Sequence, residues 1–306
     1  MISIIVCHHS TKYLEQLQKN IQETIGVPYE MIVIDNIANK YNIFQAYNQG
    51  IAQSNNNILC FAHEDILFHT CDWGKIVIDH FKEPKLGIIG VAGSHYIPKL
   101  PGGWWCSEIS SGNVIHTIEG KTFLSKWGYA HQKEKSSQAV IVDGLWFCIP
   151  RAIIKHVKFD ESTFSGFHCY DADICLQIKK LDYDIRIVFD ITIEHFSSGS
   201  RDILWLKNNL SLYNKWKKEL PKGTVKLSKS EIRKAHNATE LINQRKKYKL
   251  GVYLTIKVWY YYFRWFYPLI IIRRKIVTVH PEIAFNNPLI NSFKYILKKK
   301  IKGQKS

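Results

Sequence analysis

The chain has 306 residues, 46% of them hydrophobic, and a formal net charge of +16 at pH 7. This composition is typical of a globular protein that buries a full core. The charge is uneven: residues 1–200 hold 17 Lys and Arg against 21 Asp and Glu, whereas residues 201–306 hold 25 against 5. Any affinity for nucleic acid or an anionic membrane is therefore expected in the tail alone.

The seven cysteines are scattered, form no C-x-x-C pair, and in several cases lie within apolar runs. They are typical of reduced core thiols rather than of a disulfide framework. Met1 leads directly into ISIIVC, which lacks a basic region and is too short for the apolar part of a signal peptide. We therefore expect a cytoplasmic protein.

Strand and helix patterns alternate along the first 200 residues. Ile2–Cys7 is a continuous apolar run that predicts a strand buried on both faces, and helical spacing follows over Tyr13–Ile25. Further strands are expected at 30–34, 57–61, 85–91, 139–149 and 185–189, helices at 44–53 and 173–181, and an irregular segment at 93–135. Strands joined by helical crossovers predict a parallel α/β sheet.

Polar residues follow the predicted strands where each one ends. In an open parallel sheet the carboxyl ends of the strands meet at one edge, where active sites lie. The strand-end residues expected to converge there are His8, His9, Asp35, His63 and Asp65. The turn after the first strand reads CHHSTKY, which lacks the glycines of a dinucleotide site, and the chain has no GxxxxGK[ST] phosphate loop.

The stretch FAHEDILF, residues 61–68, holds three metal-capable side chains in a row. Residues two apart on a strand share a face, so His63 and Asp65 would point one way and Glu64 the other. A zinc site built from Cys60, His63, His69 and Cys71 is the alternative. Residues three apart on a strand face opposite ways and no C-x-x-C supports zinc, so the pattern argues against it.

Two other acidic segments stand beside predicted elements. Asp171 and Asp173 lie at a helix start, where the helix dipole favours carboxylates, and the simpler interpretation of Asp173 is a helix cap. Glu194 and His195 follow a strand and precede small polar residues. Trp104 and Trp105 could stack on a sugar, although core packing explains them equally well.

The succession of these motifs resembles the family 2 glycosyltransferases of the GT-A fold. The segments that carry the resemblance span about residues 1–200: SIIV, VIDN, AYNQGIAQSNNNILCFAHED, VDGLWFCIPRAII, FDE, YDADICLQI and the histidine of EHF. It implies an α/β, Rossmann-like, mostly parallel sheet flanked by helices. The chain would then comprise a catalytic domain at 1–215 and a basic, helical C-terminal region at 216–306.

The resemblance also implies roles for particular residues. Asp35, Asn48, Gly50 and Gly144 match positions that contact the nucleotide-sugar donor, expected to be a UDP- or dTDP-sugar. His8, at the end of the first strand, is expected at the same donor site. Asp65 matches the last acid of the family's D-x-D motif and would hold Mn or Mg, and His195 matches a histidine that joins the metal or diphosphate site. His63 is a further candidate ligand, and a structural or outer partner of the site is the alternative for it. Asp171 matches the acid of an E-D-x-D run and would be the catalytic base of an inverting transfer. Such chemistry requires a stabilised leaving diphosphate and a base for the attacking hydroxyl.

The region after Pro221 differs in character. Residues 251–272 are apolar and aromatic and long enough to span a bilayer, but Lys257 and Arg264 interrupt them on one helical stripe. This favours a helix lying on an anionic membrane surface, followed by a basic tail, and packing on the domain is the alternative. No nucleic-acid recognition motif accompanies the tail, so nucleic acid is not expected as a partner.

We therefore expect a glycosyltransferase that acts on a glycan or lipid-linked acceptor in cell-surface polysaccharide biosynthesis, cytoplasmic or peripheral at the inner face of the cell membrane. Two alternatives stay open. A catalytically inactive protein that binds glycans or membrane surfaces would explain the incomplete D-x-D. A sugar-phosphate nucleotidyltransferase would need a glycine-rich loop with Arg and Lys, which HHSTKY does not supply.

Overall fold

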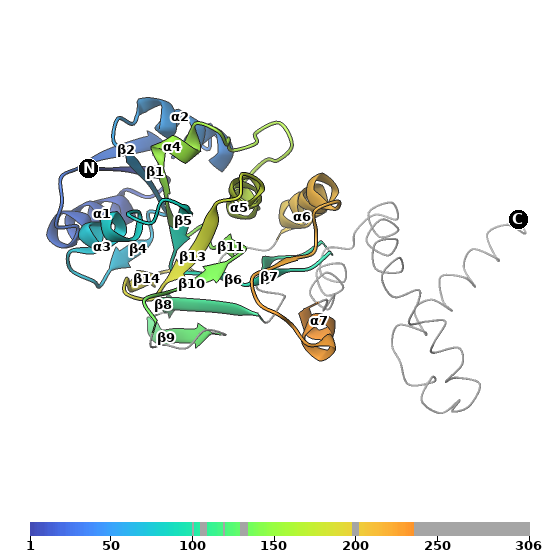
Figure 1. The fold of residues 1–306 in the computed structure, drawn as a ribbon. Coiled ribbons are helices and arrows are strands. Elements are labelled where there is room, and N and C mark those ends of the chain that lie inside the picture. Colours follow the sequence, from blue (N-terminus) through green and yellow to red (C-terminus); the bar gives the residue numbers. More distant parts are fainter. Residues whose placement is uncertain (100, 105–108, 119, 129–133, 198–201, 236–306) are drawn as a thin grey trace, which may run out of the picture. The chain divides into compact units, whose positions relative to one another are not determined.

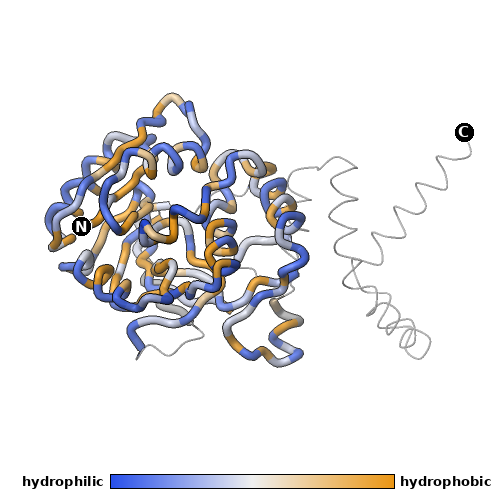
Figure 2. The backbone as a smooth tube through the Cα atoms, turned by 45° about the horizontal axis from the view of Figure 1, so that its top comes forward, coloured by the Kyte–Doolittle hydropathy of each residue, from blue (hydrophilic) through white to orange (hydrophobic). Residues whose placement is uncertain are grey.

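A computed structural model describes residues 1–99, 101–104, 109–118, 120–128, 134–197 and 202–235. The chain divides into two compact units, Met1–Lys249 and Leu250–Ser306, and the described residues all belong to the first (Figure 1). Apolar and hydrophilic residues alternate over short distances along its backbone (Figure 2), as expected for elements that bury one face.

The first unit is built on a seven-stranded sheet with the order β10-β13-β5-β12-β3-β1-β2. Its strands are β1 (Ile2–His8), β2 (Tyr29–Asp35), β3 (Ile58–Ala62), β5 (Leu86–Gly90), β10 (Ser136–Ala139), β12 (Trp146–Pro150) and β13 (Asp184–Val188). β1 pairs in parallel with β2 and β3, and β13 with β5, while β12 runs antiparallel between β3 and β5. All residues of β1 and β3 are buried, which explains their continuous apolar sequences.

Helices cover this sheet and place its connecting loops. They are α1 (Thr11–Thr24), α2 (Ile43–Gln53), α3 (Trp73–His80), α4 (Arg151–Ile154), α5 (Tyr170–Lys180) and α6 (Ile203–Trp216), with the short α7 (Lys229–Ala235) near the end of the described chain. α2 begins with a capping box between Asn42 and Gln45, and α1 buries Leu17 and Ile21. α5 begins at Tyr170, three residues before the predicted start, so that Asp171 lies in its first turn.

A second sheet takes several of its strands from a segment that the sequence patterns predicted to be irregular. Its order is β11-β6-β8-β14-β4, with β9 paired to β8. The strands are β4 (Ile66–Phe68), β6 (Ala92–Ser94), β8 (Ser110–Ile118), β9 (Lys121–Gly128), β11 (Ile141–Val142) and β14 (Ile193–His195). The prediction for 93–135 was wrong because polar and small residues in β8 are held by ladder pairing to three neighbouring strands, which outweighs their weak local preference.

The single strand predicted at 139–149 is also wrong. The chain turns at Asp143 and Gly144, so that β11 joins the second sheet and β12 the first. Gly144 is required at this turn, because a Cβ there would lie 2.2 Å from the hydroxyl of Tyr170. The turn therefore links a strand of the second sheet to a strand of the first.

The described chain continues past residue 215 without leaving the first unit. β15 (Lys222–Gly223) pairs antiparallel with β7 (Tyr96–Ile97), and Val225 and Leu227 pack against a small cluster with Tyr96, Ile109 and Ala235. A domain boundary after residue 215 stays a prediction. Residues 251–272 and the basic tail lie outside the described residues. Within the part of the chain that the structure describes, no helix is long and apolar enough to cross a membrane.

Candidate active site

Three metal-capable side chains meet where the two sheets approach each other. His63 and Asp65 lie in the loop between β3 and β4, and His195 ends β14, which pairs antiparallel with β4. Their candidate ligand atoms all lie within 4.8 Å of one another. His63, Glu64 and Asp65 are not part of a strand, so the prediction that strand alternation directs Glu64 to the opposite face was wrong. Glu64 instead bonds to the loop after β1, whereas His63 and Asp65 lie in the cluster.

Asp65 is the centre of this cluster. Its Oδ1 lies 3.6 Å from Nε2 of His195 and 3.8 Å from Nδ1 of His63, and its side chain is 18% exposed. Burial would raise the pKa of Asp65, but the neighbouring imidazoles of His195 and His63 hold it below its ordinary value. The carboxylate is therefore charged at neutral pH and available to a cation.

His63 is held on its other side by α5. Its Nε2 lies 2.7 Å from the hydroxyl of Tyr170, and that hydroxyl donates a hydrogen bond of 3.0 Å to the carbonyl of Gly144. Burial lowers the pKa of His63, with the charge of Asp65 acting in the opposite direction. The imidazole is accordingly neutral at pH 7, the form in which histidine binds metals.

Asp171 lies next to this cluster through the Gly144 turn. Its Oδ2 accepts a hydrogen bond of 3.2 Å from the Gly144 N–H, and its Oδ1 accepts one of 2.8 Å from the Ala172 N–H. Burial, and then the charge of Asp143, raise the pKa of Asp171 to about 7. A carboxylate with this pKa can both take up and release a proton near neutral pH.

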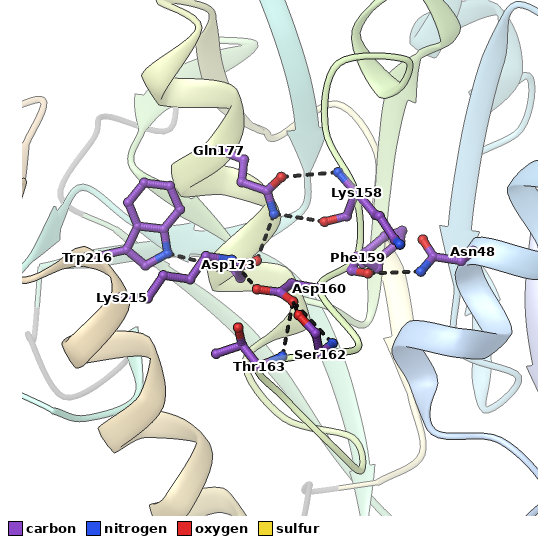
Figure 3. A network of polar contacts seen from close by, with 10 residues as sticks. All are labelled: Asn48, Lys158, Phe159, Asp160, Ser162, Thr163, Asp173, Gln177, Lys215 and Trp216. Carbon is purple, nitrogen blue, oxygen red and sulfur yellow. Dashed lines mark hydrogen bonds and ion pairs between the residues drawn. The ribbon is translucent and has the colours of Figure 1, made fainter.

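Asp173, by contrast, belongs to a buried structural network (Figure 3). Its side chain is 1% exposed and accepts hydrogen bonds from Lys215, Trp216 and Gln177 at 2.7–2.9 Å. All three of these partners are on α5 and α6, outside the metal-capable cluster. The side chain joins these two helices.

The residues expected to contact the donor nucleoside lie at the ends of β1 and β2. Asp35 is exposed and pairs in register with His8. His8 is buried, and its Nδ1 donates to Oε2 of Glu64 at 3.0 Å. Glu64 also accepts hydrogen bonds from the backbone N–H groups of His9 and Ser10, at 3.0–3.1 Å. The sequence patterns did not indicate this role of Glu64, because its partners are more than 50 residues away.

Asn48 and Gly50 on α2 make internal contacts. The Asn48 amide donates to the carbonyl of Phe159 at 2.9 Å, and a Cβ on Gly50 would lie 2.2 Å from Cγ2 of Ile5. These contacts hold α2 against β1 and against the loop before α5. A direct contact of either residue with the donor stays a prediction.

Other sequence candidates are dispersed. Sγ of Cys60 accepts from the Trp146 indole N–H, and His69 pairs with Glu194, so the structure does not bring the alternative zinc ligands together. Trp104 is 9% exposed, and Trp105 lies outside the described residues. One residue that sequence reasoning missed is His116 on β8, whose ring centroid lies 5.9 Å from that of His195.

The family model described as "Glycosyltransferase like family" matches residues 3–215, which is more than two thirds of the chain. The chain belongs to this glycosyltransferase-like family. The expected GT-A fold class is confirmed, but the main sheet is mixed rather than mostly parallel, because β10 and β12 run antiparallel to their neighbours. The protein is a transferase by family. No curated protein matches the sequence.

Several solved structures resemble this glycosyltransferase-like chain in fold. "GalNAc-T7 with UDP, GalNAc and Mn2+" has a TM-score of 0.49 at 9% identity, covering 86% of this chain and 57% of that chain. "Mannosyltransferase PcManGT from Pyrobaculum calidifontis in complex with GDP-Man and Mn2+" has 0.46 at 12% identity, covering 72% and 65%. "A197 from STIV" has 0.37 at 12%, covering 64% and 86%. The chain therefore spans less than two thirds of the length of both transferases.

Proposed function

We propose that the protein transfers a sugar from a nucleotide-sugar donor, a UDP- or dTDP-sugar, to a hydroxyl group of a glycan or lipid-linked oligosaccharide. The observation that carries this proposal is the cluster of His63, Asp65 and His195 beside Asp171. A cation site next to a titratable carboxylate is what displacement of a nucleoside diphosphate by a hydroxyl requires. The reaction would serve the biosynthesis of a cell-surface polysaccharide.

The donor set is compatible with a divalent metal. Asp65 contributes a carboxylate, and His63 and His195 contribute imidazoles. A carboxylate can bind either Mg or Mn. Mg favours oxygen for all of its ligands, so the two imidazoles make Mn the better fit. When bound, the metal would supply positive charge to the departing diphosphate.

Asp171 is the proposed catalytic base. Its carboxylate would accept the proton of the attacking acceptor hydroxyl, and its pKa of about 7 leaves a large fraction ionised at neutral pH. Attack from the side of Asp171, opposite the leaving diphosphate, would invert the sugar carbon. The Gly144 N–H, which donates to Asp171, would hold the carboxylate toward the acceptor.

The donor itself would lie between the strand ends and the Gly144 turn. Asp35, exposed at the end of β2, would accept hydrogen bonds from the nucleoside. His8, its register partner at the end of β1, would lie next to Asp35 in the same site. Gly144 would line the donor sugar next to Asp171. Asn48 and Gly50 would act in this region by holding α2 against β1.

The basic C-terminal region would bring the protein to a lipid-linked acceptor. Residues 251–272 combine aromatic and apolar side chains with Lys257 and Arg264, a pattern that favours an interfacial helix at the inner face of the cell membrane. Co-sedimentation of the full chain with vesicles tests this. Binding to vesicles that contain anionic lipid, weakened by salt, is expected, and equal binding to neutral vesicles would contradict the electrostatic part.

The decisive experiment is a screen of nucleotide sugars for thermal stabilisation with Mn²⁺, with Mg²⁺ and with chelator. One donor is expected to stabilise the protein in an Mn²⁺-dependent way and to be consumed when a suitable acceptor is added. Asp65→Ala should lose the Mn²⁺ dependence, whereas Asp79→Asn, which changes an acid with 64% side-chain exposure on α3, should keep it. Stabilisation without turnover on any acceptor would favour an inactive binding protein, and no stabilisation by any donor would refute the proposed function.

A further inference from the structure

Tyr170 and His63 stand where the sequence departs from the acids of the family's two motifs, and the two residues contact each other. His63 stands at the first position of the D-x-D slot, and Tyr170 precedes Asp171 at the start of the E-D-x-D run. They are 107 residues apart in the chain, yet the Tyr170 hydroxyl lies 2.7 Å from Nε2 of His63. The two residues that replace acids of the family motifs are therefore hydrogen-bonded to each other.

The direction of this hydrogen bond follows from the other partner of Tyr170. A tyrosine hydroxyl has one proton, and a carbonyl oxygen can only accept. Because the hydroxyl donates to the Gly144 carbonyl at 3.0 Å, its oxygen must act as an acceptor toward His63. Nε2 of His63 therefore carries a proton and donates it to Tyr170, which leaves Nδ1 as the nitrogen that can offer a lone pair to a metal.

Nδ1 is the atom of His63 that faces the candidate metal ligands. It lies 3.8 Å from Oδ1 of Asp65, which in turn lies 3.6 Å from Nε2 of His195. Histidines that bind metals commonly donate their second N–H to an oxygen that fixes the tautomer and the ring orientation. The contact with Tyr170, whose side chain is buried at 4% exposure, has this form.

We propose that Tyr170 is a positioning residue that fixes the tautomer and orientation of His63 and so makes Nδ1 a ligand for Mn²⁺. The inference rests on the proposed function only in assigning a metal to this cluster. In this arrangement the imidazole of His63 takes the place of the first D-x-D carboxylate as a metal ligand. Tyr170 holds this imidazole in the tautomer whose Nδ1 lone pair can bind the metal.

The first test uses the metal-free protein and no substrate. Nitrogen NMR of histidine-labelled protein at about pH 8, where a neutral imidazole is expected, should show His63 protonated at Nε2, with an N–H signal protected from exchange. Tyr170→Phe should abolish that protection. Protonation of His63 at Nδ1 in the wild-type protein would overturn the proposal, whether or not the protein proves to be a transferase.

The second test measures binding of Mn²⁺ alone by calorimetry. Tyr170→Phe is expected to weaken Mn²⁺ binding about 10- to 100-fold, the usual effect of losing an outer partner of a metal-binding histidine. If Tyr170 acts through His63, Tyr170→Phe should cause no further loss in a His63→Ala background. Tyr96→Phe is the matched control, because Tyr96 is a buried tyrosine that packs with Ile109 and Ala235, outside the metal-capable cluster.

The outcomes separate this proposal from the proposed function. Independent losses of Mn²⁺ affinity from the two substitutions, or an equal loss in Tyr96→Phe, would reduce Tyr170 to a general packing residue and overturn the inference. Unchanged Mn²⁺ affinity in a folded Tyr170→Phe protein would do the same. If Mn²⁺ binds as expected but no nucleotide sugar does, the proposed function fails while the role of Tyr170 stands.

Discussion

The ammonium of Lys215 on α6 lies 2.8 Å from Oδ1 of Asp173 on α5, and this carboxylate is 1% exposed (Figure 3). The same ammonium lies 2.7 Å from Oδ2 of Asp160, so one lysine bridges two acids. Through this pair, α6 holds the helix that begins with Tyr170 and Asp171. The geometry of the candidate site therefore depends on contacts outside it.

Lys215→Met is expected to destabilise the fold by about 3 kcal/mol, because it leaves a buried carboxylate without its cation. Adding Asp173→Asn should recover part of the loss, since the unpaired charge is then removed. Urea unfolding measures both effects. Lys82→Met, at a lysine side chain that is 75% exposed, serves as the control and should cost less than about 1 kcal/mol. Equal losses in both lysine variants would show that the buried pair is unimportant.

Asp171→Asn is expected to lower turnover at least about 100-fold while leaving Mn²⁺ affinity unchanged, because it removes the proposed base and not a metal ligand. In the wild-type protein, kcat/KM should rise with pH and level off above about pH 7, the pKa of Asp171. Initial rates with the identified donor measure both. Normal turnover in Asp171→Asn would show that another group is the base.

The same carboxylate should shape the pH dependence of stability. The pKa of Asp171 is higher in the folded protein, about 7, than its ordinary value of 3.8. The folded state therefore binds the extra proton between these values, and the contribution of Asp171 to stability falls as pH rises through this window. Denaturant unfolding at a series of pH values should show a weaker decline for Asp171→Asn. An identical pH profile in both proteins would contradict the raised pKa.

Glu64→Ala is expected to weaken binding of the donor nucleotide in the absence of metal about 10-fold. The Glu64 carboxylate accepts hydrogen bonds from His8 and from the backbone N–H groups of His9 and Ser10, so its loss would release the loop after β1 that forms part of the proposed donor site. Binding of Mn²⁺ alone should change much less, since Glu64 bonds to the loop after β1 and is not one of the three clustered residues. Calorimetry with the nucleoside diphosphate in chelator, and with Mn²⁺ alone, separates the two.

Glu64→Gln is the matched variant for this prediction. Its amide oxygen can still accept from the same backbone groups, so it should retain most of the nucleotide affinity. Asp65→Ala should show the opposite pattern, with weak Mn²⁺ binding and nearly normal metal-free nucleotide binding. A loss of Mn²⁺ binding in Glu64→Ala as large as in Asp65→Ala would place Glu64 in the metal site instead.

Gly144→Ala is expected to reduce both Mn²⁺ affinity and turnover. The added Cβ would lie 2.2 Å from the Tyr170 hydroxyl and would push this hydroxyl away from the backbone of residue 144. The change would disturb both the contact of Tyr170 with His63 and the hydrogen bond from the residue 144 N–H to Asp171. Gly50→Ala, where a Cβ would meet Cγ2 of Ile5 at the same distance, should lower thermal stability while leaving Mn²⁺ affinity intact in the folded protein. A Gly144→Ala protein with normal Mn²⁺ binding would contradict this account.

Local sequence patterns predicted the parts of the fold that depend on burial periodicity. The apolar runs of β1, β2 and β3 and the helical spacing of α1 and α2 appear in the structure within a few residues of the expected positions. Strand ends place polar residues at one edge of a parallel sheet, so the position of Asp65 after an apolar run was enough to make it a candidate. The family motifs added Asp171 and His195 as candidates.

The tertiary structure alone decided what those side chains contact. β8 and β9 were not predicted, because β8 is held by pairing with β6 and with β14, which lies far along the chain, and β9 in turn pairs with β8. For the same reason, sequence could not assign Glu64 to the loop after β1, Asp173 to Lys215, or Tyr170 to His63. Residue types and local spacing are properties of the chain, whereas hydrogen-bond direction, burial and the pKa shifts that follow depend on atoms brought together only by folding.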